Sequence, residues 1–481
     1  MPLYKRELIL NVSFLILANL LIKPYYIFFV ERKIQNAVGT EAWGIYFTLF
    51  SLSMVPQILL DAGLTSFINQ RLSSSRQLIQ DLWNNTIWLK PILALLFGLI
   101  YCILSFAGGY WKAYHEIIFW IGLNQILLSL VLFFRAFVSG LGHYRWDSIL
   151  SVADKFLFIL IFSISIALNQ VGTINTFLWI QSLSMIVPCI GTGWWIYSNT
   201  KVSIALLSPS KAVQLIKQSL PYAGIFLLMV LFCRMEPVWI GILRPVDGAM
   251  QSGIYAAAYR LLDAANMMGF LFAGLLLPMF SHALATQEKK EYQSIFDLAG
   301  KVMFSFAVLI SITIMSEHRA IMTLLYKDHY PDILNIVILN LIPLTINYLL
   351  STLLTAAGMA SQMNKIFLFS IITNIISHLI LTPGYGAVGA ASAALITQVI
   401  TVMLLSYLLL KKGLIHFSFR QILFISGGLM IMLSLAFLYS FLSLTPILKA
   451  GLLFVSGTFI FILTGILPLK SIFRLLKSNS A

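Results

Sequence analysis

The 481-residue chain holds 59% hydrophobic and only 10% charged residues, with a mean hydropathy of +0.92. A soluble domain carries about 25% charged residues, so this composition excludes a water-soluble globular protein and indicates a chain embedded in lipid. The net charge of +14 comes from basic residues scattered through short loops, which disfavours nucleic-acid binding and favours a topology signal.

Fourteen apolar stretches follow one another along the chain. A membrane-spanning helix needs roughly 20 apolar residues. The expected spans are 8–30, 41–67, 84–107, 115–138, 148–168, 174–198, 219–243, 252–283, 299–316, 332–356, 365–382, 387–410, 420–441 and 447–468. The sequence therefore predicts an all-α integral membrane protein with about 14 transmembrane helices.

The distribution of Lys and Arg predicts the orientation of these helices. With the N-terminus in the cytoplasm, 18 of the 31 basic residues fall in cytoplasmic segments, 7 in the opposite loops and 6 within spans. Cytoplasmic loops carry an excess of Lys and Arg, so both termini are expected in the cytoplasm.

The chain resembles itself at a shift of about 210 to 218 residues. WGIYFTLFSL at 43–52 matches SGIYAAAYRL at 252–261, and IQSLS at 180–184 matches TQVIT at 397–401. A third match joins FVSGLGHYRW at 137–146 to TAAGMASQMN at 355–364. A unit of six spans returns the chain to the same side, so the halves are expected to be parallel repeats.

This repeat divides the chain into a six-helix lobe at 1–200, a second six-helix lobe at 201–412, and two additional helices with a short basic tail at 413–481. Two such bundles facing one another across a cavity form the architecture of an alternating-access transporter.

Several charged residues lie near the middle or in the outer half of the spans. A charge at the bilayer centre costs at least roughly 2.5–3.5 kcal/mol on insertion scales, so such residues usually face protein or water and mark functional sites. The candidates for substrate binding are Lys23, Arg234 and Arg260, and those for ion coupling or pairing are Glu236, Asp263 and Asp61. Arg260 and Asp263 are three residues apart and are expected to share a helix face.

Two of these charges adjoin prolines at corresponding positions of the repeat. Lys23-Pro24 in the first span matches Glu236-Pro237 in the seventh, and Pro237 is expected to bend its helix. Interruptions at matching positions point to a transporter's binding site, and the alternative is a pair of tolerated kinks in packed helices. Arg234 and Glu236 are two apart and are not expected to pair with each other.

Charges toward the cytoplasmic side have more than one interpretation. Arg135 with Asp154 or Lys155 forms either a structural ion pair or a cytoplasmic gate. Asp61 is either a helix cap or part of an ion site. Lys90, near a span end, is expected to snorkel toward the membrane surface.

The sequence lacks the usual signatures of catalysis. It contains no G-x-x-x-x-G-K-[ST] loop, no H-E-x-x-H and no Cys/His cluster, so no catalytic residue, metal site or cofactor is expected beyond Na⁺ or H⁺ as a coupling ion. His378 is expected to be a structural histidine. The three cysteines are expected to be core residues. A membrane glycan polymerase needs a large catalytic external loop, and the external segment at 317–331 supports that alternative poorly. A drug exporter would favour an acidic or aromatic cavity over a basic one.

Three stretches resemble the bacterial polysaccharide-transport flippases (Wzx-like) of the multidrug/oligosaccharidyl-lipid/polysaccharide (MOP) exporter superfamily. They are residues 19–73, SGIYAAAYRL at 252–261 and GYGAVGAASAALITQ at 384–398. The resemblance implies a MATE-like fold of two six-helix lobes around a cationic cavity, with two extra C-terminal helices. The role of lining this cavity is transferred to Lys23, Arg234 and Arg260 on their place in the topology more than on a strict motif match.

The function implied is translocation of undecaprenyl-diphosphate-linked oligosaccharide, of O-antigen, capsule or exopolysaccharide, across the bacterial inner membrane. Expected partners are this glycolipid, membrane lipid, and a polymerase or ligase of the glycan pathway, with no nucleic acid. The alternatives within the superfamily are a lipid II flippase and a cation-coupled multidrug antiporter. Cationic side chains suit the diphosphate, since Arg and Lys supply charge-assisted hydrogen bonds in a low-dielectric cavity.

Overall fold

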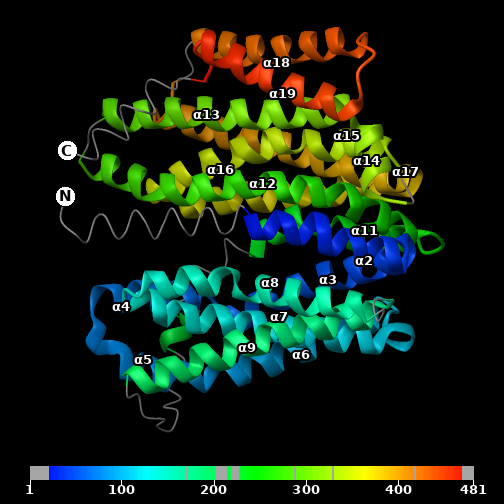
Figure 1. Cartoon of the computed structure of the whole chain (residues 1–481). Coiled ribbons are helices and arrows are strands. Elements are labelled where there is room, and N and C mark those ends of the chain that lie inside the picture. The colour runs from blue at the N-terminus through cyan, green and yellow to red at the C-terminus, as the bar shows by residue number, and fades with distance from the viewer. Residues whose placement is uncertain are drawn as a thin grey trace. The chain divides into compact units, whose positions relative to one another are not determined.

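A computed structural model describes residues 21–168, 172–200, 214–217, 227–286, 289–327, 330–416 and 419–467, and in these ranges it is helical and contains no strand (Figure 1). Ten helices in the described ranges are long and apolar enough to cross a membrane, and 426–440 is a shorter apolar helix. The predicted all-α membrane fold is confirmed. The predicted span 8–30 lies largely outside the described residues, and span 219–243 lies outside them up to residue 226.

The chain divides into two compact units, 2–253 and 254–481, and the boundary falls within the residues of one long helix. In the first unit the helical elements are η1 (Tyr26–Glu31), α2 (Arg32–Val38), α3 (Thr40–Asp61), α4 (Leu64–Ser74), η2 (Arg76–Leu78), α5 (Ile79–Ile87), α6 (Leu89–Ala107), α7 (Trp111–Gly140), α8 (Tyr144–Ala167), α9 (Ile174–Thr200), α11 (Glu236–Leu243) and the start of α12 (Gly248–Ala285). Long helices α3, α6, α7, α8 and α9 pack on one another, and α11 packs on α3.

Most of α12 belongs to the second unit, with α13 (Lys289–Ser316), α14 (His318–Leu325), α15 (Asp332–Leu339), α16 (Leu341–Ala356), α17 (Ala360–Lys411), α18 (Phe419–Ser440) and α19 (Pro446–Leu463). α17 contains both predicted spans 365–382 and 387–410, joined at a kink where Gly386 has a φ of 56°. The external segment 317–331 contains the short helix α14.

The two C-terminal helices α18 and α19 pack on α13, and a buried apolar cluster joins the three. Gly457 of α19 allows this approach, because a β-carbon there would overlap the sulfur of Met432. The division at Gly253 groups α11 and the first turns of α12 with the helices before them. The lobe boundaries drawn from the internal repeat stay a prediction.

Candidate functional site

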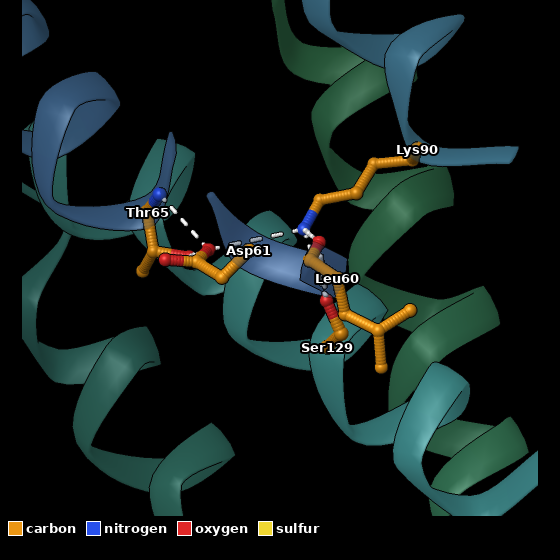
Figure 2. Close-up of polar contacts among 5 residues, drawn as sticks. All are labelled: Leu60, Asp61, Thr65, Lys90 and Ser129. Carbon is orange, nitrogen blue, oxygen red and sulfur yellow. Dashed lines mark hydrogen bonds and ion pairs between the residues drawn. The ribbon is translucent and has the colours of Figure 1, made fainter. Parts of the chain in front are cut away.

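The side chain of Lys90, in the first turn of α6, points toward Leu60, Asp61 and Ser129 (Figure 2). Its ammonium donates hydrogen bonds to the carbonyl oxygen of Leu60 at 2.8 Å and to the hydroxyl of Ser129 at 3.0 Å. The carboxylate of Asp61 lies 3.9 Å from the same nitrogen, and the ring centroid of Phe133 lies 5.0 Å from it. Lys90 is 4% exposed, so the predicted snorkelling is wrong.

A signal for this burial was present in the sequence. Lys90, Leu93, Phe97 and Tyr101 follow one another at steps of three or four residues, and all four are buried on one face of α6. The lysine therefore continues the packed stripe of its helix, and its ammonium needs partners inside the protein.

The partners of Lys90 come from a break between α3 and α4. Ala62 and Gly63, between these helices, both have positive φ, of 47° and 78°, which turns the chain sharply. On one side Lys90 holds the carbonyl of Leu60, and on the other Asp61 accepts hydrogen bonds from the Thr65 amide at 3.1 Å and from the Thr65 hydroxyl. The Asp61 carboxylate therefore accepts a hydrogen bond from a backbone amide in the first turn of α4, whose N-cap position is held by Gly63, and its assignment to an ion site stays a prediction.

Replacing Lys90 by methionine is expected to lower the unfolding temperature of the detergent-purified protein. The carbonyl of Leu60 would keep only the Ser129 hydroxyl as a donor, at 3.1 Å, and the Ser129 oxygen would lose the hydrogen bond that it accepts. Hydrogen bonds from a charged donor contribute about 1.5–3 kcal/mol each, so their loss should destabilise the fold. Thermal unfolding followed by intrinsic fluorescence measures the change. Lys112→Met, on the exposed first turn of α7, is the matched control. Equal unfolding temperatures for the two variants would contradict a structural role of the cluster.

The seventh span is broken where the sequence places its charges. Residues 231–233 are helical, the helix stops at Arg234 and Met235, and α11 begins at Glu236 with Pro237 in its first turn. The predicted bend is confirmed, since a proline cannot donate the backbone hydrogen bond that would continue the preceding helix. Arg234 is half-buried and Glu236 is 2% exposed. Within the described ranges, Oε2 of Glu236 has no hydrogen-bond partner.

The first span is irregular at the matching place. Lys23 is half-buried in the helical segment 21–25, directly before the π-helix η1. π-Helical turns are rare and frequently occur at functional sites. Both repeat-related spans therefore depart from regular α-helix beside Lys23-Pro24 and Glu236-Pro237.

Arg260 and Asp263 share a helix face as predicted, with Nη1 of Arg260 lying 3.5 Å from Oδ2 of Asp263. Both belong to the second unit, whereas Lys23 and Arg234 belong to the first. Each cation is therefore placed within its own unit, and a cavity shared by all three stays a prediction.

The charges assigned to a cytoplasmic gate pair differently from the prediction. Nε of Arg135 lies 2.8 Å from Oδ1 of Asp147, and Asp154 instead lies 3.2 Å from Nζ of the adjacent Lys155. The reason is the short turn from α7 to α8, which brings the first turn of α8 and its Asp147 to Arg135. Asp154 lies about two turns farther along α8. The Lys155 ammonium lies 4.8 Å from the centroid of the Tyr26 ring.

Two repeat-related glycines meet where α3 and α12 cross. A β-carbon on Gly44 would overlap the carbonyl oxygen of Ala249, and one on Gly253 would overlap the carbonyl oxygen of Thr40. Both pairs of matching positions are 209 residues apart (253 − 44 and 249 − 40). The contact is therefore made twice by equivalent residues, as at an interface with two-fold symmetry. We call this contact the glycine seam.

Polar side chains surround the glycine seam. The carbonyl of Pro237 accepts hydrogen bonds from the hydroxyls of Thr48 at 3.3 Å and Ser252 at 3.2 Å. Through these hydrogen bonds the broken seventh span contacts both helices of the glycine seam, α3 and α12. In the turn from α11 to α12, Arg244 donates to Asp247, and this bond holds the pKa of the Asp247 carboxyl below its ordinary value.

The two units also repeat a hydrogen-bonded Asn–Gln pair between helices. In the first, Nδ2 of Asn124 on α7 donates to Oε1 of Gln181 on α9 at 3.2 Å. In the second, Nδ2 of Asn347 on α16 donates to Oε1 of Gln398 on α17 at 3.1 Å. Gln181 and Gln398 are paired in the sequence match of 180–184 with 397–401, so this internal repeat has a structural counterpart.

The chain is similar to a known protein family and to a curated membrane protein. A family model described as "Polysaccharide biosynthesis protein" matches residues 8–284. An uncharacterized membrane protein of Methanocaldococcus jannaschii is 24% identical over 406 residues, which cover 80% of this chain and 94% of that protein.

Two solved structures share the fold. The lipid II flippase MurJ in an inward closed conformation aligns with a TM-score of 0.67 at 16% identity, covering 95% of this chain and 99% of that one. An inward-facing multidrug resistance MATE family transporter of the MOP superfamily aligns with a TM-score of 0.66 at 15% identity, covering 81% and 94%. The fold that the resemblance implied is confirmed.

Proposed function

The chain belongs to the polysaccharide biosynthesis protein family, and on that premise we propose that it is a flippase for undecaprenyl-diphosphate-linked oligosaccharide. In this proposal it moves repeat units of O-antigen, capsule or exopolysaccharide from the cytoplasmic to the periplasmic leaflet of the bacterial inner membrane. The fold shared with a lipid II flippase supports a lipid-linked substrate.

The observation that carries the proposal is the broken seventh span, with Arg234 at the break and Glu236 directly after it. Irregular backbone at membrane depth is tolerated only where it is buried in protein or lines a water-filled cavity. Discontinuous spans at repeat-related positions are where transporters bind their substrates. An arginine there suits a diphosphate, because its guanidinium binds phosphate oxygens through two parallel hydrogen bonds.

Alternating access then requires the contacts between the two halves of the repeat to open and close. The glycine seam joins helices that belong to different halves of the sequence repeat. We assign it as the closed gate on the side predicted to be periplasmic. The proposed contacts with the phosphates are Lys23, Arg234 and Arg260. The proposed protein partners are polymerase or ligase enzymes of the glycan pathway.

A gene deletion tests the proposal. Loss of the flippase should cause the undecaprenyl-diphosphate-linked repeat unit to accumulate in the cytoplasmic leaflet, where only an enzyme added from the cytoplasmic side reaches it. Single units accumulating in the periplasmic leaflet would instead identify a polymerase. Translocation of lipid II by the protein, with no accumulation of the linked repeat unit in the deletion strain, would favour the lipid II alternative. Export of cationic drugs would favour the multidrug antiporter.

Glu236 is the proposed coupling acid, with Na⁺ or H⁺ as the coupling ion. Glu236→Gln is expected to remove the dependence of flipping on an imposed pH or Na⁺ gradient, because the amide keeps the shape but cannot ionise. Flipping in proteoliposomes with each gradient applied separately measures the effect. Glu41→Gln, at an exposed position in the first turn of α3, is the control. Flipping that ignores both gradients in the unmodified protein would refute coupling altogether.

A further inference from the structure

Arg32 lies at the end of the first span that is predicted to be periplasmic. It is the first residue of α2, which ends at Val38. The side chain is half-buried, and within the described ranges its Nε is buried without a hydrogen-bond partner and its guanidinium forms no ion pair. The fork of N–H donors in a guanidinium matches the oxygens of a phosphate group. The Arg32 side chain is therefore suited to bind a phosphate that the chain itself does not provide.

The π-helix η1 turns Arg32 toward the side of the span that carries Lys23. Each residue of a regular α-helix rotates by about 100°, so the nine-residue separation (32 − 23) would place the two cations on opposite sides. η1 lies between them, and a π-helical turn holds one residue more than an α-helical turn. The angle between Lys23 and Arg32 then falls to about 80°, at a distance of about 12 Å along the helix axis. Both cations therefore lie on one side of the first span.

The residues next to Arg32 in the sequence face other directions. Glu31 is 6% exposed, whereas Lys33 is exposed. Successive helical residues point about 100° apart, so the Glu31 carboxylate and the Lys33 ammonium leave the helix on either side of Arg32. Of the two adjacent cations, Arg32 is the one partly enclosed by protein, and Lys33 is its natural comparison.

Arg32 is also connected to the glycine seam through its own helix. Gln35, one turn farther along α2, donates a hydrogen bond from its side-chain amide to the carbonyl oxygen of Gly253 at 3.4 Å. At the end of α2, Gly39 alone separates this helix from Thr40, the first residue of α3 and part of the seam. Separation of α3 from α12 would therefore displace α2 and Arg32 with it.

We propose that Arg32 receives the diphosphate of the transported glycolipid as the glycine seam opens. This proposal rests on the flippase function proposed above, in which Lys23 and Arg234 hold the diphosphate while the seam is closed. An unpaired charge inside a protein is costly, so a second cation farther along the same side of the span keeps the diphosphate paired as it moves outward. The Arg32 guanidinium binds its oxygens through parallel N–H···O bonds, and water replaces the guanidinium when the substrate leaves.

Initial flipping rates in proteoliposomes, with undecaprenyl-diphosphate-linked oligosaccharide loaded in one leaflet, test the role of Arg32. Arg32→Ala should reduce the rate about tenfold, and Arg32→Lys should give an intermediate rate because it keeps the charge without the fork. Lys33→Ala, which removes the same charge from the next residue, should flip at the unmodified rate. Equal rates for Arg32→Ala and Lys33→Ala would overturn the proposal. An unmodified protein that moves no glycolipid would instead overturn the proposed function, and this proposal with it.

Photocrosslinking separates the glycolipid from ordinary phospholipids, which also carry a phosphate. Benzoylphenylalanine at Asn36, four residues from Arg32 and on the same helix face, should crosslink to the radiolabelled glycolipid. The yield should rise about threefold in Gly44→Ala, where the added methyl group would overlap the carbonyl oxygen of Ala249 and favour the open seam. Adding Arg32→Ala should lower the yield about tenfold.

Two outcomes of the crosslinking would contradict the assignment. Crosslinks to phospholipid alone would show that Arg32 anchors the span to the membrane surface and would overturn the transport role. A glycolipid yield that stays the same when the seam opens would overturn the link to the seam. Arg32→Lys keeps a cation at this position, so its rate decides the phosphate assignment even if Arg32→Ala fails to fold.

Discussion

Gly44→Ala is expected to reduce flipping by at least about tenfold while leaving the amount of protein in the membrane unchanged. The added methyl group would overlap the carbonyl oxygen of Ala249, so α3 and α12 would have to separate. Overpacking a close contact costs about 1–3 kcal/mol, and in a transporter this cost falls on the state in which the contact is closed. The variant should therefore favour the conformation in which the seam is open.

The repeated geometry of the seam provides a second, independent variant. Gly253→Ala would overlap the carbonyl oxygen of Thr40 in the same way, so it should reduce flipping to a similar extent. Gly98→Ala is the matched control, because a β-carbon at Gly98 in α6 has no atom within 4 Å. All three changes replace helical glycine by a stronger helix former, so a loss confined to Gly44 and Gly253 identifies the seam as its cause.

The accessibility of Thr40 distinguishes an open gate from a misfolded protein. Thr40 is buried in the closed seam, so a cysteine there should react slowly with an impermeant maleimide added from outside. The background for this measurement replaces the native Cys102, Cys189 and Cys233. Gly253→Ala should increase the labelling rate, and normal flipping with unchanged labelling would contradict the gate.

The spans and the repeat were predictable because they depend on properties that are local in the sequence. Bilayer thickness fixes the length of each apolar stretch, and duplicated segments keep their order. The Gly-Ile-Tyr match even pairs Gly44 with Gly253, the two residues that the fold brings together. The bend beside Pro237 was predictable for the same reason, since proline acts on its own helix.

Partners across helices depend on how each helix is rotated and how each turn closes, and single-sequence reasoning does not provide this information. Lys90 was assigned to the membrane surface because it is near a span end, yet it lies on the buried stripe of α6. Arg135 was paired with Asp154 or Lys155 on depth alone. The tight α7–α8 turn brings Asp147 closer. Depth in the membrane therefore does not decide which charged side chains pair with one another.

Arg234→Ala is expected to reduce flipping of a diphosphate-linked oligosaccharide by about a hundredfold. The guanidinium offers two parallel hydrogen bonds to phosphate, and hydrogen bonds to charged groups are worth about 1.5–3 kcal/mol each. Arg234→Lys keeps the charge but loses the fork-shaped donor, so an intermediate rate is expected. Lys23→Ala should reduce the flipping rate less than Arg234→Ala does, because a lysine contributes only a single point charge to the phosphate.

Initial flipping rates in proteoliposomes, with the glycolipid loaded in one leaflet, measure these effects. Arg319→Ala is the control, because the Arg319 side chain is 77% exposed on α14 and lies outside the long spans. The unfolding temperature of Arg234→Ala should stay close to that of the unmodified protein, since Arg234 lies at a helix break instead of inside a packed helix. Flipping at the unmodified rate by both Arg234→Ala and Lys23→Ala would reject the basic cavity. In that case the family fold would remain, and the diphosphate would have to be neutralised elsewhere, with Arg260 and its partner Asp263 the next residues to replace.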